Sequence, residues 1–335
     1  ATAALKDNLL AYQRNFYTER KRKRGYYLAS AEGDPTRLQE FVRILRGHQI
    51  EVEALTSDVT AEGKTFKAGE AIAIPLDQPQ ATYLETLWRE QLEFEENIFY
   101  DVSTWTLPWA FNLSHTRDAV TNAKTEAMFS SVDDDESKLG QSAIGYLIDW
   151  RDSASPALLY DLLEAGANVR VATAPFTALT TNEGSINFGY GTLFVAPKLQ
   201  ESIPQPVLSL LAEAHAEGLA IYPAASSYTP EGIDLGSRAF DVLSLPKVLM
   251  VTGPGTSAYG TGEIWHLLDR RLDMPLTMVD SNRLSRVNLD DYTHVIMTTP
   301  VRLEGVSKQL ESFITDGGIL WAQGASTVAW AADAG

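Results

Sequence analysis

The stretch of the sequence that most suggests chemistry lies near its carboxyl end, where residues 317–330 read GGILWAQGASTVAW. An apolar run, expected to be a buried strand, breaks at a turn of small residues and continues into a helical pattern. In many α/β hydrolytic folds such a strand–turn–helix junction carries the catalytic nucleophile. Here the turn is Ala322-Gln323-Gly324, and none of these three side chains is a nucleophile.

Two histidine–carboxylate pairs have the spacing of metal ligands. His48-x-x-Glu51 matches the first two zinc ligands of metallocarboxypeptidases, although the same residues suit an ordinary junction between a helix and a strand. Glu263-x-x-His266 would lie on one helical face, as in carboxylate–histidine sites of helical bundles. Alternatively, Glu263 lies in the first helical turn and His266 packs at an interface. Neither pair has a convincing third ligand, so we predict no metal site in this chain.

The loop GPGTSAYGTG, residues 253–262, follows an expected strand and precedes an expected helix. In doubly wound folds the backbone N–H groups of such a loop bind anions. The sequence matches neither common nucleotide-binding motif, and the glycines are also explained by positive φ angles and close approach. The loop therefore predicts, as an alternative function, a small-ligand site formed by Gly255, Tyr259, Gly260, Gly262 and Glu263.

The composition excludes some classes of partner. The net charge is −17, from 27 basic and 44 acidic residues, and would repel nucleic acids and anionic membranes. The one basic run, residues 19–24, is interpreted as the solvated end of a helix, with an anion-binding patch as the alternative. The chain has no cysteine and no apolar stretch long enough to span a membrane. We therefore expect no nucleic-acid partner, no membrane span, no disulfide and no cysteine nucleophile.

The pattern of elements predicts several three-layer α/β/α units with mostly parallel sheets, because strands and helices alternate along the chain. The first unit begins with the strand YYLAS and a helix that starts at Asp34-Pro35, followed by the strand IEVEAL and a hairpin-like pair in KTFKAGEAIAIPL. No sequence repeat is evident. The acidic stretch 132–137 is the best linker candidate. The expected parts are a linking helix over 1–24, α/β units over 25–130 and 131–244, and a final domain over 245–335.

Three segments carry a resemblance to a known family. Residues 248–284 (VLMVTGPGTSAYGTGEIWHLLDRRLDMPLTMVDSNRL), 97–113 (NIFYDVSTWTLPWAFNL) and 232–243 (GIDLGSRAFDVL) resemble the C-terminal region of large bacterial zinc carboxypeptidases, which are carboxypeptidase A-like metallopeptidases. The resemblance covers the chain from about residue 64 onward. It implies that the last domain is flavodoxin-like and related to class I glutamine amidotransferases.

The resemblance implies that the parent protein hydrolyses C-terminal peptide bonds with zinc. Its zinc ligands would lie upstream, so we expect no cofactor in this segment. The expected partners are the missing N-terminal peptidase domain and a peptide substrate, and a periplasmic or secreted location follows from the family. The chain starts inside a helical pattern without methionine, which agrees with a fragment of a longer protein.

The same resemblance interprets the turn at residues 322–324. Active amidotransferase-like domains carry Cys-x-Gly there, and aligning the glycine with Gly324 places Ala322 at the nucleophile position. Ser326 is not followed by a histidine and an acid, so it is a poor substitute. We therefore predict a non-catalytic segment with a structural or substrate-positioning role, and rank an independent hydrolase last. The strand 319–322 is expected at the centre of its sheet, with its end facing the 253–262 loop.

Overall fold

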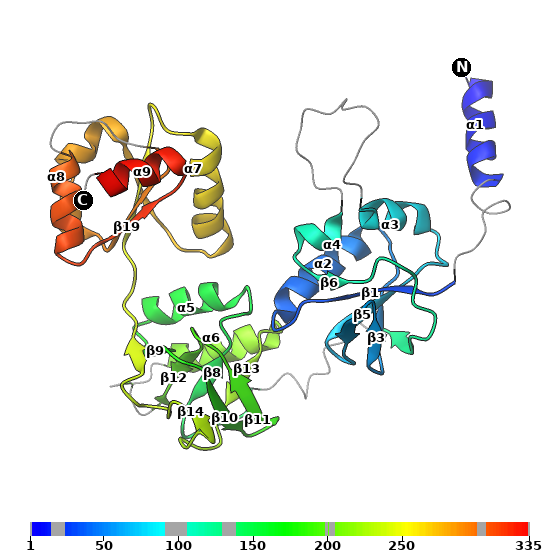
Figure 1. Cartoon of the computed structure of the whole chain (residues 1–335), viewed down its shortest axis with the longest axis horizontal. Helices are drawn as coiled ribbons and strands as arrows, with labels where there is room; N and C mark the ends of the chain where they lie inside the picture. Colours follow the sequence, from blue (N-terminus) through cyan, green and yellow to red (C-terminus); the bar gives the residue numbers. More distant parts are fainter. Residues whose placement is uncertain are drawn as a thin grey trace. The chain divides into compact units, whose positions relative to one another are not determined.

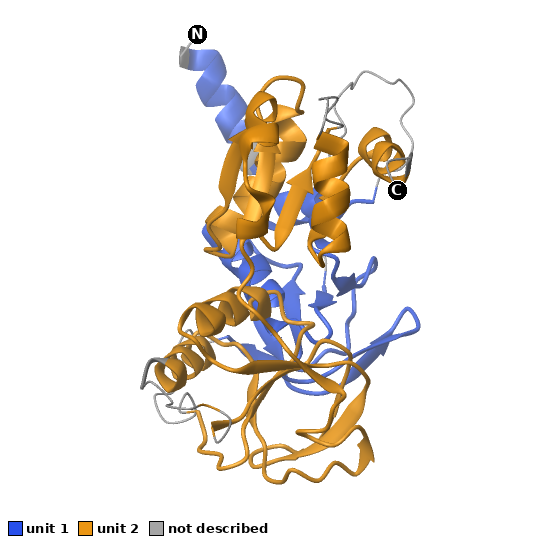
Figure 2. Cartoon of the chain, turned by 90° about the vertical axis from the view of Figure 1, so that its left-hand side faces the viewer, with its two compact units in different colours: residues 1–136 blue, residues 137–335 orange. Residues whose placement is uncertain are grey.

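The computed structural model describes residues 2–14, 24–90, 106–128, 139–197, 200, 205–299 and 306–333. The chain forms two compact units, residues 1–136 and 137–335, shown separately coloured in Figure 2. The finer division into four parts stays a prediction. The acidic stretch 132–137 and all of the basic run except Arg24 lie outside the described residues. The described part of the predicted linking helix is α1 (Thr2–Arg14). No helix among the described residues is long and apolar enough to cross a membrane.

The first unit opens with the local signals that its sequence contains. Asp34 caps helix α2 by accepting a hydrogen bond from the Arg37 backbone N–H at 2.9 Å, and Pro35 occupies the first helical position. The predicted strand at residues 26–30 and the predicted helix end at Gly47 are confirmed. The elements are β1 (Tyr26–Ser30), α2 (Pro35–Gly47), β2 (Glu53–Leu55), β3 (Val59–Ala61), β4 (Lys64–Phe66), β5 (Ala71–Pro75), α3 (Ala81–Trp88), α4 (Leu107–Ala110), β6 (Ser114–His115) and β7 (Thr125–Ala127).

Five of these strands form one antiparallel sheet in the order β6-β1-β5-β2-β7. Alternate residues of β1 point to opposite faces, as a strand requires. Tyr27 and Ala29 pack with the helices α2 and α3, whereas Leu28 packs with the two-stranded sheet β3-β4 on the other face. The layers are thus helices, a five-stranded sheet and a short hairpin (Figure 1).

Residues 146–242 repeat this arrangement. Their main sheet has the order β13-β8-β12-β9-β15, again antiparallel throughout. Helices α5 and α6 pack on one face, and the small sheet β11-β10-β14 covers the other. The elements are β8 (Tyr146–Ile148), α5 (Ser155–Glu164), β9 (Val169–Ala172), β10 (Phe176–Thr180), β11 (Gly184–Phe188), β12 (Leu193–Val195), α6 (Gln205–Ala216), β13 (Ile221–Pro223), β14 (Glu231–Gly232) and β15 (Phe240–Val242).

The two regions, hereafter the first copy (residues 26–127) and the second copy (residues 146–242), also share sequence. Phe-x2-Gly-x5-Pro-x2-Gln occurs once in each, from Phe66 to Gln78 and from Phe188 to Gln200. The two glutamines accept equivalent hydrogen bonds. The side-chain oxygen of Gln78 accepts from the backbone N–H of Glu51 at 2.7 Å, and that of Gln200 accepts from the backbone N–H of Asn168 at 2.6 Å. Each therefore fixes the segment before the second strand of its copy, and the two copies share this contact as well as their topology.

The prediction of mostly parallel sheets and α/β/α layers was wrong for both copies. Strands β1 and β2, joined by α2, do run in the same direction, but β5 lies between them and is antiparallel to both. Strand β12 takes the same place between β8 and β9. The predicted hairpin within 64–76 was also wrong, because β4 pairs with β3 and not with β5. A strand–helix–strand pattern does not reveal that a later strand inserts between its two strands.

The carboxyl-terminal part has a parallel sheet, as predicted, in the order β17-β16-β18-β19. Helix α7 and the π-helix His266–Arg271 pack on one face, and α8 packs on the other. The fold is therefore mixed α/β, with antiparallel sheets before this parallel one. The elements are β16 (Val248–Thr252), α7 (Ala258–Trp265), β17 (Thr277–Asp280), β18 (His294–Met297), α8 (Val306–Thr315), β19 (Ile319–Ala322) and α9 (Ala325–Asp333).

Candidate functional site

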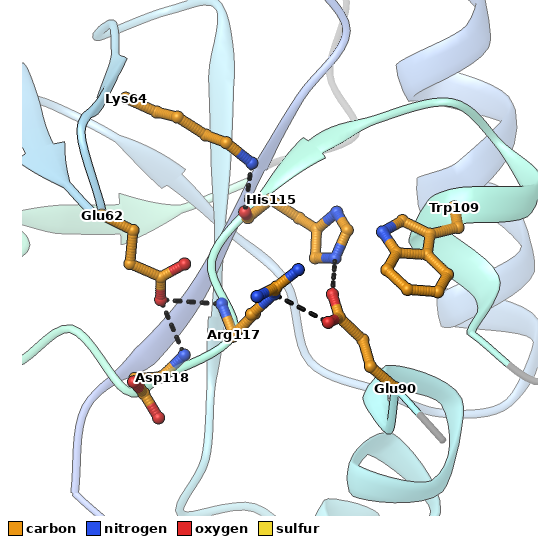
Figure 3. Close-up of a pocket in the computed structure, with 7 residues that line it drawn as sticks. All are labelled: Glu62, Lys64, Glu90, Trp109, His115, Arg117 and Asp118. Atoms are coloured by element: carbon orange, nitrogen blue, oxygen red, sulfur yellow. Dashed lines mark hydrogen bonds and ion pairs between the residues drawn. The ribbon is translucent and has the colours of Figure 1, made fainter. Parts of the chain in front are cut away.

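A pocket of about 460 Å³ lies in the first copy, where charged side chains from separate segments converge (Figure 3). The β3–β4 hairpin provides two of its residues, the segment after α3 one, helix α4 an aromatic ring, and the segment from β6 onward the rest. Thr106 donates a hydrogen bond to the Arg89 carbonyl at 2.6 Å, which joins the segments that carry the acid and the ring. The lining residues are Glu62, Lys64, Glu90, Trp109, His115, Arg117 and Asp118.

Glu62 holds the hairpin against the segment after β6. Its φ angle is +50°, a left-handed conformation that non-glycine residues adopt at a cost. One carboxylate oxygen, Oε1, accepts hydrogen bonds from the backbone N–H groups of Arg117 and Asp118, both at 2.8 Å. Lys64, two residues on, donates to the His115 carbonyl at 3.2 Å. The hairpin turn is thus fixed by three contacts with residues 115–118.

His115 lies between two hydrogen-bond acceptors. Its Nδ1 is 3.0 Å from the Leu113 carbonyl oxygen, and its Nε2 is 3.3 Å from Glu90 Oε1. Because a carbonyl oxygen only accepts, the contact with Leu113 requires the hydrogen on Nδ1. The His115 side chain is 3 % exposed, and Glu90 is 17 % exposed. The pair therefore lies at the wall of the pocket, with the imidazole almost wholly buried.

Arg117 completes this group of charges. Its Nε lies 2.7 Å from Glu90 Oε2, so both oxygens of that carboxylate have partners. The two terminal nitrogens of the guanidinium have no hydrogen-bond partner among the described residues, and the side chain is 67 % exposed. The Asp118 carboxylate points away from the guanidinium (Figure 3). Asp118, with Glu85, adds to the effect of burial in raising the pKa of Tyr27 in the neighbouring core.

The Gly253 to Gly262 loop has the predicted strand–loop–helix form. It follows β16 and leads into α7, whose N-cap Ser257 accepts a hydrogen bond from the Gly260 N–H. Gly255 has the predicted positive φ, at +85°, but Gly260 and Gly262 lie inside helix α7, so positive φ was wrong for them. The Tyr259 side chain is 87 % exposed.

The turn at Ala322 also has the predicted form, because β19 ends at Ala322, Gly324 has a φ of +87°, and α9 begins at Ala325. The prediction that β19 lies at the centre of its sheet was wrong for the described strands: β19 pairs with β18 alone and forms an edge. Strands β16 and β17 lie on the other side of β18, so β19 is the last strand at this end of the sheet. The side-chain Oε1 of Gln323 is buried and has no hydrogen-bond partner among the described residues.

Thr298, directly after β18, lies between the loop and the turn. Its hydroxyl is 2.9 Å from that of Thr261 in α7. A Cβ atom added at Gly260 would lie 4.0 Å from Thr298 Cβ, and one added at Gly324 would lie 4.0 Å from the Thr298 carbonyl oxygen. Both predicted segments therefore contact the same residue at the carboxyl ends of the parallel strands. A crevice shared by Ala322 and Tyr259 stays a prediction.

The two histidine–carboxylate pairs occupy separate places. His48 caps the end of α2 and packs edge-on against Tyr83, with ring centroids 5.0 Å apart, as expected for a helix-to-strand junction. Glu263 is not in the first turn of α7, and His266 is exposed, so both structural roles proposed for that pair were wrong. Among the described residues, no group of three His, Cys, Asp or Glu side chains could hold a metal ion.

Sequence reasoning missed the pocket of the first copy. His115 and Arg117 are close in the sequence, but their common partner Glu90 lies about 25 residues earlier, after helix α3, and meets them only in the folded chain. The signal that could have helped is the repeated Phe-x2-Gly-x5-Pro-x2-Gln, because aligning the copies shows where their residue types diverge.

The comparisons with protein-family models, curated proteins and solved structures found no match to this chain.

Proposed function

We propose that this chain is a non-catalytic C-terminal portion of a zinc metallocarboxypeptidase, with a structural or substrate-positioning role. The proposal rests on the resemblance of residues 97–113, 232–243 and 248–284 to that family. The observation that carries the non-catalytic part is the junction between β19 and α9, where Ala322 occupies the position at which the resemblance expects a cysteine nucleophile. A methyl side chain cannot attack a carbonyl carbon.

The parent reaction implied by the resemblance is zinc-assisted hydrolysis of a C-terminal peptide bond. The described residues do not fit the metal, because no suitable group of three ligating side chains lies among them. We therefore derive no step of that reaction from this chain. Its own contribution would be to support the peptidase domain or to position the peptide that the domain cleaves.

The test combines metal analysis with activity assays. The purified chain should bind less than one equivalent of zinc and should hydrolyse neither glutamine, nor simple esters, nor C-terminal peptide bonds. The Ala322→Cys variant should remain inactive, because the general base is missing as well. Hydrolysis by the unmodified chain that disappears in Ser326→Ala would overturn the proposal. Sequencing the gene upstream of Ala1 should show a zinc-binding peptidase domain.

A second candidate function is a small-ligand module at the carboxyl ends of the parallel strands. The favouring observation is Gln323 Oε1, a buried acceptor without a hydrogen-bond donor among the described residues; it lies in the turn that approaches Thr298, as the Gly253 to Gly262 loop does. An N–H group of a peptidic ligand would satisfy this oxygen, while the loop and Glu263 would contact the ligand's termini.

This alternative can be tested with glycylglycine as the probe. Titration to about 10 mM should shift the backbone amide resonances of Gly255 and Gly260, and Gln323→Leu should abolish the shifts. Glu213→Gln, on the exposed face of α6, is a control that should leave them unchanged. Unchanged resonances in the unmodified chain would reject the ligand-binding role.

A further inference from the structure

The strongest feature outside the proposed function is the pocket of the first copy, because the second copy shows what the same scaffold looks like without it. The register of the strands aligns the two copies residue by residue. Ala29 faces the helices and pairs with Ile72 and His115, and Ile148 faces the helices of the second copy and pairs with Leu193 and Ile221. His115 therefore corresponds to Ile221, and Arg117, two residues later, corresponds to Pro223.

The hairpins align in the same way. Phe66 pairs with Val59 in the first copy, and Phe188 pairs with Phe176 in the second. Two residues before these phenylalanines, Lys64 corresponds to Ile186. In the second copy Ile186 packs in the hydrophobic cluster under the small sheet, Ile221 packs in the cluster under the helices, and Pro223 is buried.

The scaffold therefore folds with apolar residues at these positions, and it does not need charges there. In the first copy the same places carry an ammonium, an imidazole and a guanidinium beside a pocket. Polar groups that a fold does not require, gathered in a concave site, indicate binding. This inference does not depend on the proposed function.

The chemistry of the ligand follows from which groups are already paired. Both oxygens of Glu90 are used by His115 and Arg117, and Oε1 of Glu62 is used by two backbone N–H groups. Among the described residues, the unused donors are the two terminal nitrogens of Arg117, next to Glu90, and the remaining N–H groups of Lys64, while the unused acceptors, Glu62 Oε2 and the Asp118 carboxylate, belong to the hairpin side of the pocket. A planar guanidinium presents these donors in the geometry of a carboxylate.

Trp109 determines the other end of the ligand. Its indole ring is 40 % exposed and lines the pocket near His115, with ring centroids 6.4 Å apart. Figure 3 shows the ring on the same side of the pocket as the Arg117 guanidinium and Glu90. An exposed indole beside a cation favours a flat apolar group.

We propose that this pocket binds a small carboxylate with a flat apolar body, the carboxylate on the terminal nitrogens of Arg117 and the body against Trp109. Lys64 adds attraction for the negative charge from the opposite wall. Glu90 acts as a positioning residue, because it fixes the Nε side of the guanidinium and leaves the other side for the ligand.

Benzoate is the probe, and calorimetric titration of the full chain measures its binding. We expect a Kd of about 1 mM, with acetate, which lacks the ring, and benzamide, which lacks the charge, each binding at least about tenfold more weakly. Arg117→Gln should weaken benzoate binding by about tenfold or more, the effect of losing a charge-assisted hydrogen bond. Trp109→Leu should weaken benzoate but not acetate binding.

The matched control is Arg43→Gln, which removes an arginine of similar exposure that also pairs with a glutamate in the first unit. It should change the Kd by less than about twofold. Lys64→Gln, on the exposed hairpin, serves if Arg117→Gln does not fold, and it should weaken benzoate binding by about threefold. Equal binding to all variants, no benzoate binding by the unmodified chain at about 10 mM, or binding of inorganic phosphate without benzoate would each overturn the assignment.

Discussion

The first and second copies share one topology and differ most where the hairpin meets the edge strand. In the second copy the backbone N–H of Thr181 bonds to the Pro223 carbonyl and that of Ala225 to the Leu179 carbonyl, so the longer hairpin closes onto the segment around β13. In the first copy the short hairpin reaches residues 115–118 through the side chains of Glu62 and Lys64. The hairpin is therefore held by main-chain hydrogen bonds in the second copy and by side-chain hydrogen bonds beside the pocket in the first copy.

This difference separates the residues that make the scaffold from those that make a site. Gln78 and Gln200 make equivalent hydrogen bonds in both copies and belong to the scaffold. The buried aspartates Asp34 and Asp152 belong to it as well, because each accepts a hydrogen bond from a backbone N–H near the start of the first helix of its copy. The charged residues of the pocket occur in one copy alone, and the predictions below use that contrast.

The largest effect is expected from placing an arginine in the second copy at Ala224, next to Pro223, the counterpart of Arg117. Ala224 is 2 % exposed inside an apolar cluster, so Ala224→Arg would bury an unpaired cation. We expect a loss of about 4 kcal/mol in the free energy of unfolding, or failure to fold. In the first copy, Arg117→Ala removes an exposed side chain and should lower the free energy of unfolding by less than about 1 kcal/mol. Urea denaturation followed by circular dichroism measures the free energy of unfolding of both variants. Similar losses in the two variants would contradict the proposed difference between the copies.

The next largest effect is expected from the two scaffold glutamines, Gln78 and Gln200, and the loss of stability should be the same for both. Gln78→Ala and Gln200→Ala each remove a side chain that bonds the backbone at both its oxygen and its nitrogen. We expect each to cost about 2 kcal/mol, because backbone groups lose their partners.

The control is Gln80→Ala, because the Gln80 side chain makes no cap hydrogen bond to α3. Amide hydrogen exchange should localise each loss to its own copy. A cost confined to Gln78→Ala would show that the two glutamines are not equivalent.

Glu62 gives a smaller effect that is specific to the first copy. Glu62→Ala removes the acceptor of two backbone hydrogen bonds and leaves a residue without a polar side chain in a left-handed conformation. We expect a cost of about 1 kcal/mol and loss of benzoate binding, since the hairpin would no longer be fixed. Glu62→Asn tolerates the conformation and should recover part of the stability but not the binding. Retained binding in Glu62→Ala would show that the hairpin does not shape the pocket.

The sequence predicts those parts of this fold that depend on neighbouring residues. Asp34-Pro35 starts α2 because a cap and a proline act within one turn, and Gly324 permits the turn after β19 through its own φ angle. The partner of a strand depends on distant segments, so neither the insertion of β5 between β1 and β2 nor the edge position of β19 follows from local patterns. The pocket was missed for the same reason, because His115 and Glu90 meet only through the sheet.

The smallest expected effect concerns Tyr222, which is next to Ile221, the counterpart of His115. Burial, followed by the charges of Glu183 and Asp149, raises the pKa of the Tyr222 hydroxyl from 10.0 to about 12. The unfolded chain then loses this proton at a lower pH than the folded chain, so folding stability is complete below pH 10 and falls as the pH rises towards 12. Tyr222→Phe removes the hydroxyl and should reduce the loss of unfolding free energy between pH 10 and pH 12. The stability at neutral pH should stay almost unchanged, because the hydroxyl has no hydrogen-bond partner among the described residues. Urea denaturation at pH 9 and pH 11 measures the change in unfolding free energy. Tyr228→Phe, at an exposed tyrosine of the same copy, is the control and should show the same loss between these pH values as the unmodified chain. An unchanged loss of unfolding free energy between pH 9 and pH 11 in Tyr222→Phe would show that Tyr222 is not shielded from water. The expected difference between the apolar site of the second copy and the charged pocket of the first would then be contradicted.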